Sequence, residues 1–82
     1  MTDLISLKVR KRNGMEFEGD VYAVSGINEI GPFDILFNHA NFVAKIKDKI
    51  IIHKDKNNIK EIEITNGIIY AKENLVEIFL GI

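Results

Sequence analysis

The chain has 82 residues, a net charge of −1 and no cysteine, which suits one small domain over residues 1–82 that depends on its core or on a partner for stability. The absence of cysteine excludes a disulfide framework and cysteine-based zinc or iron–sulfur sites, and no apolar run reaches the roughly 18 residues of a membrane span. The near-neutral charge argues against a general affinity for polyanions, so we expect a soluble, cytoplasmic protein with no nucleic-acid partner.

The first predicted elements form a β-hairpin. Apolar and polar residues alternate over residues 5–10, which is the period of a strand with one buried face. Asn13-Gly14 favours the positive φ angles of a tight turn, and residues 15–18 are expected to return along the first strand. Gly19 suggests a bulge or a close backbone approach, and residues 22–27 continue as an extended segment.

The second half of the chain predicts further short strands. Alternation over residues 42–47 and the β-branched run at 50–52 predict two strands, and a polar turn follows at 55–58. Residues 61–65 alternate again, and Asn66-Gly67 predicts a second hairpin turn or a bulge.

Two more predicted strands, at 68–71 and 75–80, complete the series, with a polar turn at 72–74 between them. No window shows a helical period with caps. Many short strands at regular turn spacing predict an all-β sandwich or barrel.

The order of these features resembles a known family. The segments ISLKV, MEFEGDVYAVSG, GPFDILFNHANFVAKI, KIIIH and EIEITNGIIYAKENLVEIFL follow one another as in the N-terminal β-sandwich of the epsilon subunit of bacterial rotary ATP synthase. Phe17-Glu18-Gly19 stands where the family closes its second strand. The family's hallmark loop is matched by Gly31, Phe33, Ile35, Leu36, His39 and Ala40. The resemblance covers nearly the whole chain and implies a two-sheet β-sandwich or flattened barrel.

Three departures from the family pattern change residues that shape this loop. Asp34 replaces a glycine, Phe37-Asn38 replaces proline-glycine, and Asn41 replaces a second proline. Asparagine tolerates the left-handed conformation better than most residues, so we expect Asn38 to keep the turn. The loop at 25–31 is longer than is usual in the family by roughly two residues, in a region where connections vary freely.

The resemblance also implies a function, that of a non-catalytic rotor component of the central stalk. Such a subunit binds the gamma subunit and the membrane ring, couples ion flow to ATP synthesis, and lies peripherally on the inner face of the cell membrane. It needs no cofactor and no metal. Many family members add a C-terminal helical hairpin that binds ATP or inhibits hydrolysis, and since this chain stops at Ile82 that role is not carried over.

Five residues are the predicted partner contacts. Glu29 is expected to pair with basic ring loops, Gly31 and Pro32 to shape the loop, and Asn38 and His39 to form a hydrogen-bonding knuckle. For His39 an alternative stays open, in which the imidazole binds a neighbouring backbone group inside the domain.

Other functions find less support in the sequence. No nucleophilic-serine motif or phosphate loop occurs, and Glu61 and Glu63 are expected to form a solvated strand face rather than an acid–base pair. Basic residues at 8–12 and 45–49 suit an oligonucleotide groove poorly, because the aromatic residues cluster elsewhere, in the acidic half. The main alternative is a divergent free-standing module that binds another protein or itself, with Phe37 exposed or in an interface and Phe42 in the core.

Overall fold

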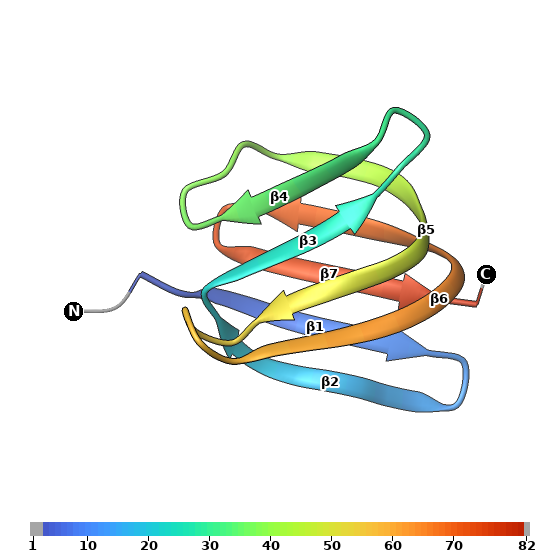
Figure 1. Cartoon of the computed structure of the whole chain (residues 1–82), viewed down its shortest axis with the longest axis horizontal. Helices are drawn as coiled ribbons and strands as arrows, with labels where there is room; N and C mark the ends of the chain where they lie inside the picture. The colour runs from blue at the N-terminus through green and yellow to red at the C-terminus, as the bar shows by residue number, and fades with distance from the viewer. Residues whose placement is uncertain (1–2, 82) are drawn as a thin grey trace.

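The computed structural model describes residues 3–81, which form seven β-strands joined by turns and no helix (Figure 1). The strands are β1 (Ile5–Lys11), β2 (Gly14–Val21), β3 (Ala23–Ile27), β4 (Pro32–Leu36), β5 (Phe42–His53), β6 (Ile59–Lys72) and β7 (Leu75–Leu80). The predicted all-β class is confirmed. Within this range no helix could span a membrane. Residues 1, 2 and 82, the ends of the expected domain, lie outside the described part of the chain.

All seven strands belong to one hydrogen-bonded sheet in the order β2-β1-β7-β6-β5-β3-β4. The sheet folds over itself because β5 and β6 are long enough to run through both layers of a sandwich (Figure 1). The second half of β5 pairs with β3 in one layer, whereas the second half of β6 pairs with β7 in the other. Every pair is antiparallel except β1 with β7, which is parallel. The predicted sandwich is therefore confirmed, with its two layers continuous at the long strands.

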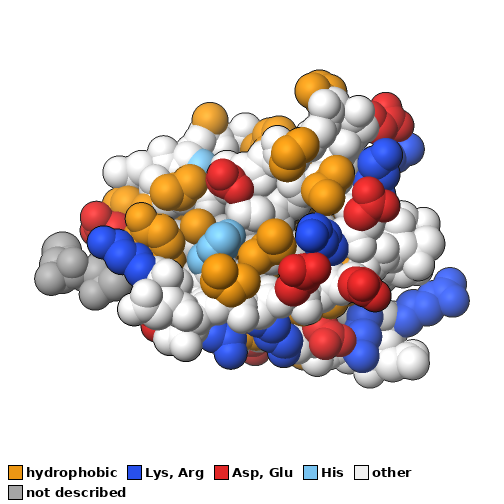
Figure 2. Space-filling view, viewed as in Figure 1, with side chains coloured by type: hydrophobic (Ala, Val, Ile, Leu, Met, Phe, Trp, Pro, Cys, Tyr) orange, Lys and Arg blue, Asp and Glu red, His pale blue; other side chains and the backbone are white. Residues whose placement is uncertain are grey.

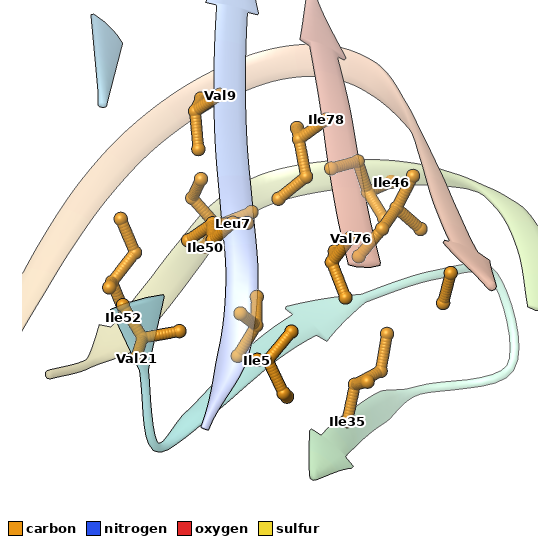
Figure 3. Close-up of a cluster of buried hydrophobic side chains, with 13 residues drawn as sticks. Ile5, Leu7, Val9, Val21, Ile35, Ile46, Ile50, Ile52, Val76 and Ile78 are labelled. Carbon is orange, nitrogen blue, oxygen red and sulfur yellow. The ribbon is translucent and has the colours of Figure 1, made fainter. Parts of the chain in front are cut away.

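The core lies between the two layers and is made of aliphatic side chains from alternate strand positions (Figure 3). Its fully buried members include Ile5, Leu7, Val9, Val21, Val24, Ile50, Ile52, Ile69, Val76 and Ile78. No charged or polar residue in the described range is buried with them. The rings of Phe33 and Phe42, whose centroids are 5.1 Å apart, pack at the edge where β4 meets the start of β5, which confirms Phe42 as a core-facing residue.

The first hairpin differs from the prediction in its turn residues. Lys11 pairs with Gly14, so the turn consists of Arg12 and Asn13, and only Gly14 has a positive φ, at +146°. The register also shifts beyond Val9, which leaves Glu16 as the bulged residue of β2. The bulge or close backbone approach predicted at Gly19 is wrong, because Gly19 pairs in regular register with Leu7 and an added Cβ would meet only the Phe17 ring, at 3.6 Å.

The two strands predicted at 42–47 and 50–52 are one strand, β5. Between them Asp48 takes a left-handed conformation with a φ of +68°, and the register passes from Lys47 opposite Asn66 to Lys49 opposite Glu63. One residue of β5 thus faces two of β6, which is a bulge that bends both strands from one layer into the other.

For Asn66-Gly67 a hairpin turn or a bulge was predicted. The turn is wrong, since both residues lie inside β6, but the bulge of β6 directly precedes Asn66. Gly67 is buried, and a Cβ atom there would lie 2.7 Å from the Phe79 carbonyl oxygen of β7. The missing side chain of Gly67 therefore allows the backbones of β6 and β7 to approach closely. The turn predicted at 55–58 is confirmed, with the Asp55 carboxylate accepting the Asn57 and Asn58 backbone N–H groups at 2.8 and 3.0 Å.

Candidate functional site

The turn between β3 and β4 brings together Glu29, Gly31 and Pro32. Asn28 and Gly31 exchange backbone hydrogen bonds of 3.0 and 3.1 Å, and the Asn28 side-chain oxygen accepts the N–H groups of Ile30 at 2.8 Å and Gly31 at 3.1 Å. Gly31 has a φ of +144°, a conformation that a side chain rarely allows, so its predicted loop-shaping role has a structural basis. Pro32 opens the edge strand β4, where a missing N–H costs no ladder bond.

Two further contacts brace this hairpin below its tip. The Ser25 hydroxyl lies 2.5 Å from Asp34 Oδ1 and 2.9 Å from His53 Nε2. Since the carboxylate only accepts, Ser25 donates to Asp34 and His53 Nε2 donates to Ser25. The chain of bonds ties β4 through β3 to β5. Above it, the Phe33 ring covers Gly26, where an added Cβ would lie 2.8 Å from the ring.

The second turn, between β4 and β5, carries Asn38 and His39. Asn38 takes the left-handed conformation that was predicted, with a φ of +64°. Its N–H donates to the Asn74 side chain at 3.1 Å, and the Asn41 side chain accepts the Glu73 N–H at 3.4 Å. The side chains of Asn41 and Asn74 thus connect the Asn38–His39 knuckle to the β6–β7 turn.

His39 is held within the knuckle. Its Nδ1 bonds the Ala40 carbonyl oxygen at 2.8 Å, so the alternative of a bond to a neighbouring backbone group is confirmed for this nitrogen. Nε2 is buried and has no hydrogen-bond partner among residues 3–81. Phe37 is partly buried, so the expected exposure is wrong, whereas the alternative of a place in an interface stays a prediction.

The five predicted residues therefore form two groups rather than one patch. Glu29, Gly31 and Pro32 lie at the start of β4, whereas Asn38 and His39 follow its end. A five-residue strand separates the groups by on the order of 15 Å. The sequence interpretation missed Ile30, which is 96% exposed at the hairpin tip. Asn28, two residues earlier and of a type that forms side-chain turns, is the local signal that marked the tip.

An apolar groove on the outer face of β6 and β7 was also missed. It has a volume of about 530 Å³ and is lined by Ile68, Tyr70, Lys72, Leu75, Glu77 and Phe79. The Tyr70 and Phe79 rings meet edge to face with centroids 5.9 Å apart. The groove lies in the layer opposite the β3–β4 hairpin.

Charges on the described surface are mixed rather than gathered into one field, as Figure 2 shows for one face. Arg10 lies 3.5 Å from Glu77, and Lys49 lies 3.4 Å from the exposed carboxylate of Glu61. A hydrogen bond from Lys11 and its positive charge lower the pKa of Glu16. Residues 3–81 contain no group of three or more side chains arranged to hold a metal ion. The basic stretches thus lie among acids, which does not favour an oligonucleotide groove.

The fold and these turns define a β-sandwich that presents two rigid turns at opposite ends of one edge strand. Comparison with known proteins identifies its family, because residues 4–80 match the model described as "ATP synthase, Delta/Epsilon chain, beta-sandwich domain". The chain therefore belongs to the delta/epsilon chain β-sandwich family of ATP synthase, and the resemblance seen in the sequence is confirmed.

Individual relatives agree with this family. The chain is 39% identical over 51 residues to the ATP synthase epsilon chain of Campylobacter jejuni subsp. doylei, a match that spans 62% of this chain and 40% of that protein. Its fold is similar to a chain of the mitochondrial ATP synthase of Euglena gracilis, with a TM-score of 0.88 and 14% identity over 98% of this chain and 52% of that one. A chain in the central stalk and c-ring structure of the Tetrahymena thermophila mitochondrial enzyme gives a TM-score of 0.79 and 13% identity, over 96% and 64% of the two chains. The chain thus spans less than two thirds of each relative.

Proposed function

We propose that the protein is an epsilon-type, non-catalytic component of the central stalk of a rotary ATP synthase. In this role it binds the gamma subunit and the membrane ring and couples ion flow to ATP synthesis, as a peripheral part of the complex on the inner face of the membrane. The match of residues 4–80 to the family's sandwich carries the proposal. It is supported by similarity to chains of the Euglena OSCP/F1/c-ring structure and of the Tetrahymena central stalk and c-ring structure.

The construction of the sandwich suits a part that transmits load. β5 and β6 cross from one layer to the other, so the layers are joined by backbone as well as by side-chain packing. The aliphatic core between them is fully enclosed, and close-packed interiors deform little. A force applied at one turn is therefore delivered to the rest of the domain with small internal displacement.

The two turns at the ends of β4 are the contact points of this proposal. The exposed carboxylate of Glu29 is offered to basic side chains of the ring loops, and Gly31 and Pro32 hold the turn that presents it. Asn38 and His39 form the second contact, fixed to the β6–β7 turn through Asn74. Their hydrogen bonds within the domain leave the knuckle ordered before a partner arrives, which lowers the entropic cost of binding.

A pull-down tests the proposal directly. The chain is immobilised and offered the gamma subunit from the same cell, and then the membrane ring in detergent. Stoichiometric capture of both is expected, and failure of the folded chain to capture either would overturn the rotor role. Glu29→Lys is expected to reduce ring capture, whereas Glu18→Lys, at an exposed glutamate of edge strand β2, serves as the charge-matched control. Equal capture by the two variants would remove Glu29 from the contact set.

A second candidate function is a free-standing module that binds itself or another protein. The apolar groove on β6 and β7 favours it, because its lining includes Tyr70 at 47% exposed and Leu75 at 41% exposed. Light scattering after size exclusion tests self-association. A monomer across all concentrations would rule that version out.

A further inference from the structure

The tip of the β3–β4 hairpin presents an isoleucine to solvent almost completely. Ile30 is 96% exposed, and the next most exposed large apolar residue in the described range is Val43 at 63%. Figure 2 shows hydrophobic side chains at this projecting hairpin. Single exposed apolar residues are common on protein surfaces and carry no meaning by themselves. The way in which this one is held is what distinguishes it.

The backbone under Ile30 is fixed on both sides of the side chain. Its own N–H donates to the Asn28 side-chain oxygen at 2.8 Å, and the same oxygen accepts the Gly31 N–H at 3.1 Å. The paired backbone bonds between Asn28 and Gly31 close the turn. Ile30 is therefore held outward on a closed turn and not on a loose loop.

The hairpin is also fixed further down. The Phe33 ring fills the space above Gly26, and the bonds from Ser25 to Asp34 and His53 tie the hairpin to β5. A side chain that is ordered before binding loses little conformational entropy on contact, so its burial is converted more fully into affinity.

We propose that Ile30 is the apolar anchor of the partner contact at this hairpin. Its side chain enters a small apolar pocket of a partner protein, and a basic side chain at the rim of that pocket pairs with Glu29. The inference deepens the proposed function and rests on it, since the protein partner at this hairpin is the membrane ring. It assigns the contact to two adjacent residues, Glu29 and Ile30. Glu29 provides the charge, and Ile30 provides the apolar area that is buried on binding.

The charge of the hairpin favours a protein pocket over a lipid surface. Residues 23–36 contain Glu29 and Asp34 and no lysine or arginine. Anionic headgroups attract basic segments and repel acidic ones, and a single apolar side chain is far too small to hold a protein on a membrane. A pocket with a basic rim satisfies both residues of the pair.

The test compares binding of the whole chain and its variants to the gamma–ring complex in detergent. Full burial of the three outer carbons of isoleucine is worth roughly 60-fold in Kd, and burial of a little over half of that area about tenfold, so Ile30→Ala is expected to raise the Kd by at least about tenfold. Ile30→Leu keeps the apolar volume and is expected to retain most of the affinity. The matched control is Ile59→Ala, at an isoleucine that is 62% exposed at the start of β6. It is expected to change the Kd by less than about twofold, and circular dichroism confirms the fold of each variant.

The outcomes separate the two proposals. No binding by the parent chain overturns the proposed function and this inference with it, whereas parent binding that Ile30→Ala retains overturns this inference alone. Equal weakening by Ile30→Ala and Ile59→Ala also overturns it, because the effect is then not specific to the tip. Binding that depends on Ile30 to phosphatidylglycerol–phosphatidylethanolamine vesicles, or self-association that depends on Ile30, would replace the protein pocket with a lipid surface or a second copy.

Discussion

Replacing Gly67 by alanine tests whether β7 approaches β6 as closely as the structure shows. The added Cβ would lie 2.7 Å from the Phe79 carbonyl oxygen and 3.1 Å from Leu80 Cδ2. The oxygen belongs to the backbone of a paired strand, so it cannot rotate away as a side chain would. Overpacking of this kind costs roughly 1–3 kcal/mol, and the alanine returns about 0.4–1 kcal/mol by restricting the unfolded chain. The central values of these two ranges give a net loss in the free energy of unfolding of about 1–2 kcal/mol.

Gly19→Ala supplies the matched control. An added Cβ there meets only the Phe17 ring, at 3.6 Å, which is ordinary contact. This variant is expected to match the parent or to gain up to about 1 kcal/mol. Thermal and urea unfolding, followed by circular dichroism, measure both variants. For a domain of this size the Gly67→Ala loss corresponds to a fall in Tm of roughly 4–16 °C. A Gly67→Ala variant as stable as the parent, or an equal loss in both variants, would refute the reasoning.

Three further predictions concern the bulge, a turn and the polar chain beneath the hairpin. Asp48→Gly should keep or raise the free energy of unfolding, while Asp48→Val should lower it by about 1–3 kcal/mol because Asp48 has a φ of +68°; equal effects in urea unfolding would contradict the left-handed bulge. A hydrogen bond from the Asn58 side chain lowers the pKa of Asp55 in the folded protein. The stabilisation that the Asp55 carboxylate provides is therefore present above its ordinary pKa of 3.8, and it is lost as the pH falls through the lower pKa of the folded state. The stability difference between the parent and Asp55→Ala should therefore shrink in acid, and a difference that grows would reverse the assigned sign. Ser25→Ala should lower the free energy of unfolding by about 1 kcal/mol, because it removes the hydroxyl that links the Asp34 and His53 side chains. The control Ser6→Ala, at a partly buried serine in β1, should lower it by less than about 0.5 kcal/mol. Equal losses in the two variants would show that the link contributes nothing.

Local patterns in the sequence predict most of the strands but not their continuity. Alternation at residues 5–10 and the polar turn at 55–58 depend on neighbouring residues, and both are confirmed. Asn66-Gly67 has the composition of a hairpin turn, yet the chain does not reverse there and β6 continues to Lys72. Glycine is needed at position 67 because the Phe79 backbone of β7 lies so close, and a contact with a distant strand leaves no local pattern in the sequence.

In the candidate site, too, the features that depend on neighbouring residues were predictable, and those that depend on distant residues were not. The left-handed Asn38 follows from its residue type and from the family resemblance, and the structure bears it out. The bond between Ser25 and His53 joins residues 28 positions apart, so it appears only after β3 and β5 have paired. The exposure of Ile30 was hidden for a similar reason, because an apolar residue between two strands gives no sign of which side it faces.

The position of β7 between β1 and β6 in the sheet has a consequence for how the chain reaches its fold. β1 finds β2 immediately along the chain, but its other neighbour is β7, where Ser6 pairs with Leu75. Before β7 is synthesised, neither β1 nor β2 has a strand partner among β3, β4, β5 and β6. During translation the sheet therefore stays in two pieces with open edges until residues 75–80 leave the ribosome, and these edges are the part of the nascent chain most exposed to wrong pairing. Pairing between the first and last strands also slows folding, which we expect on the scale of milliseconds to seconds.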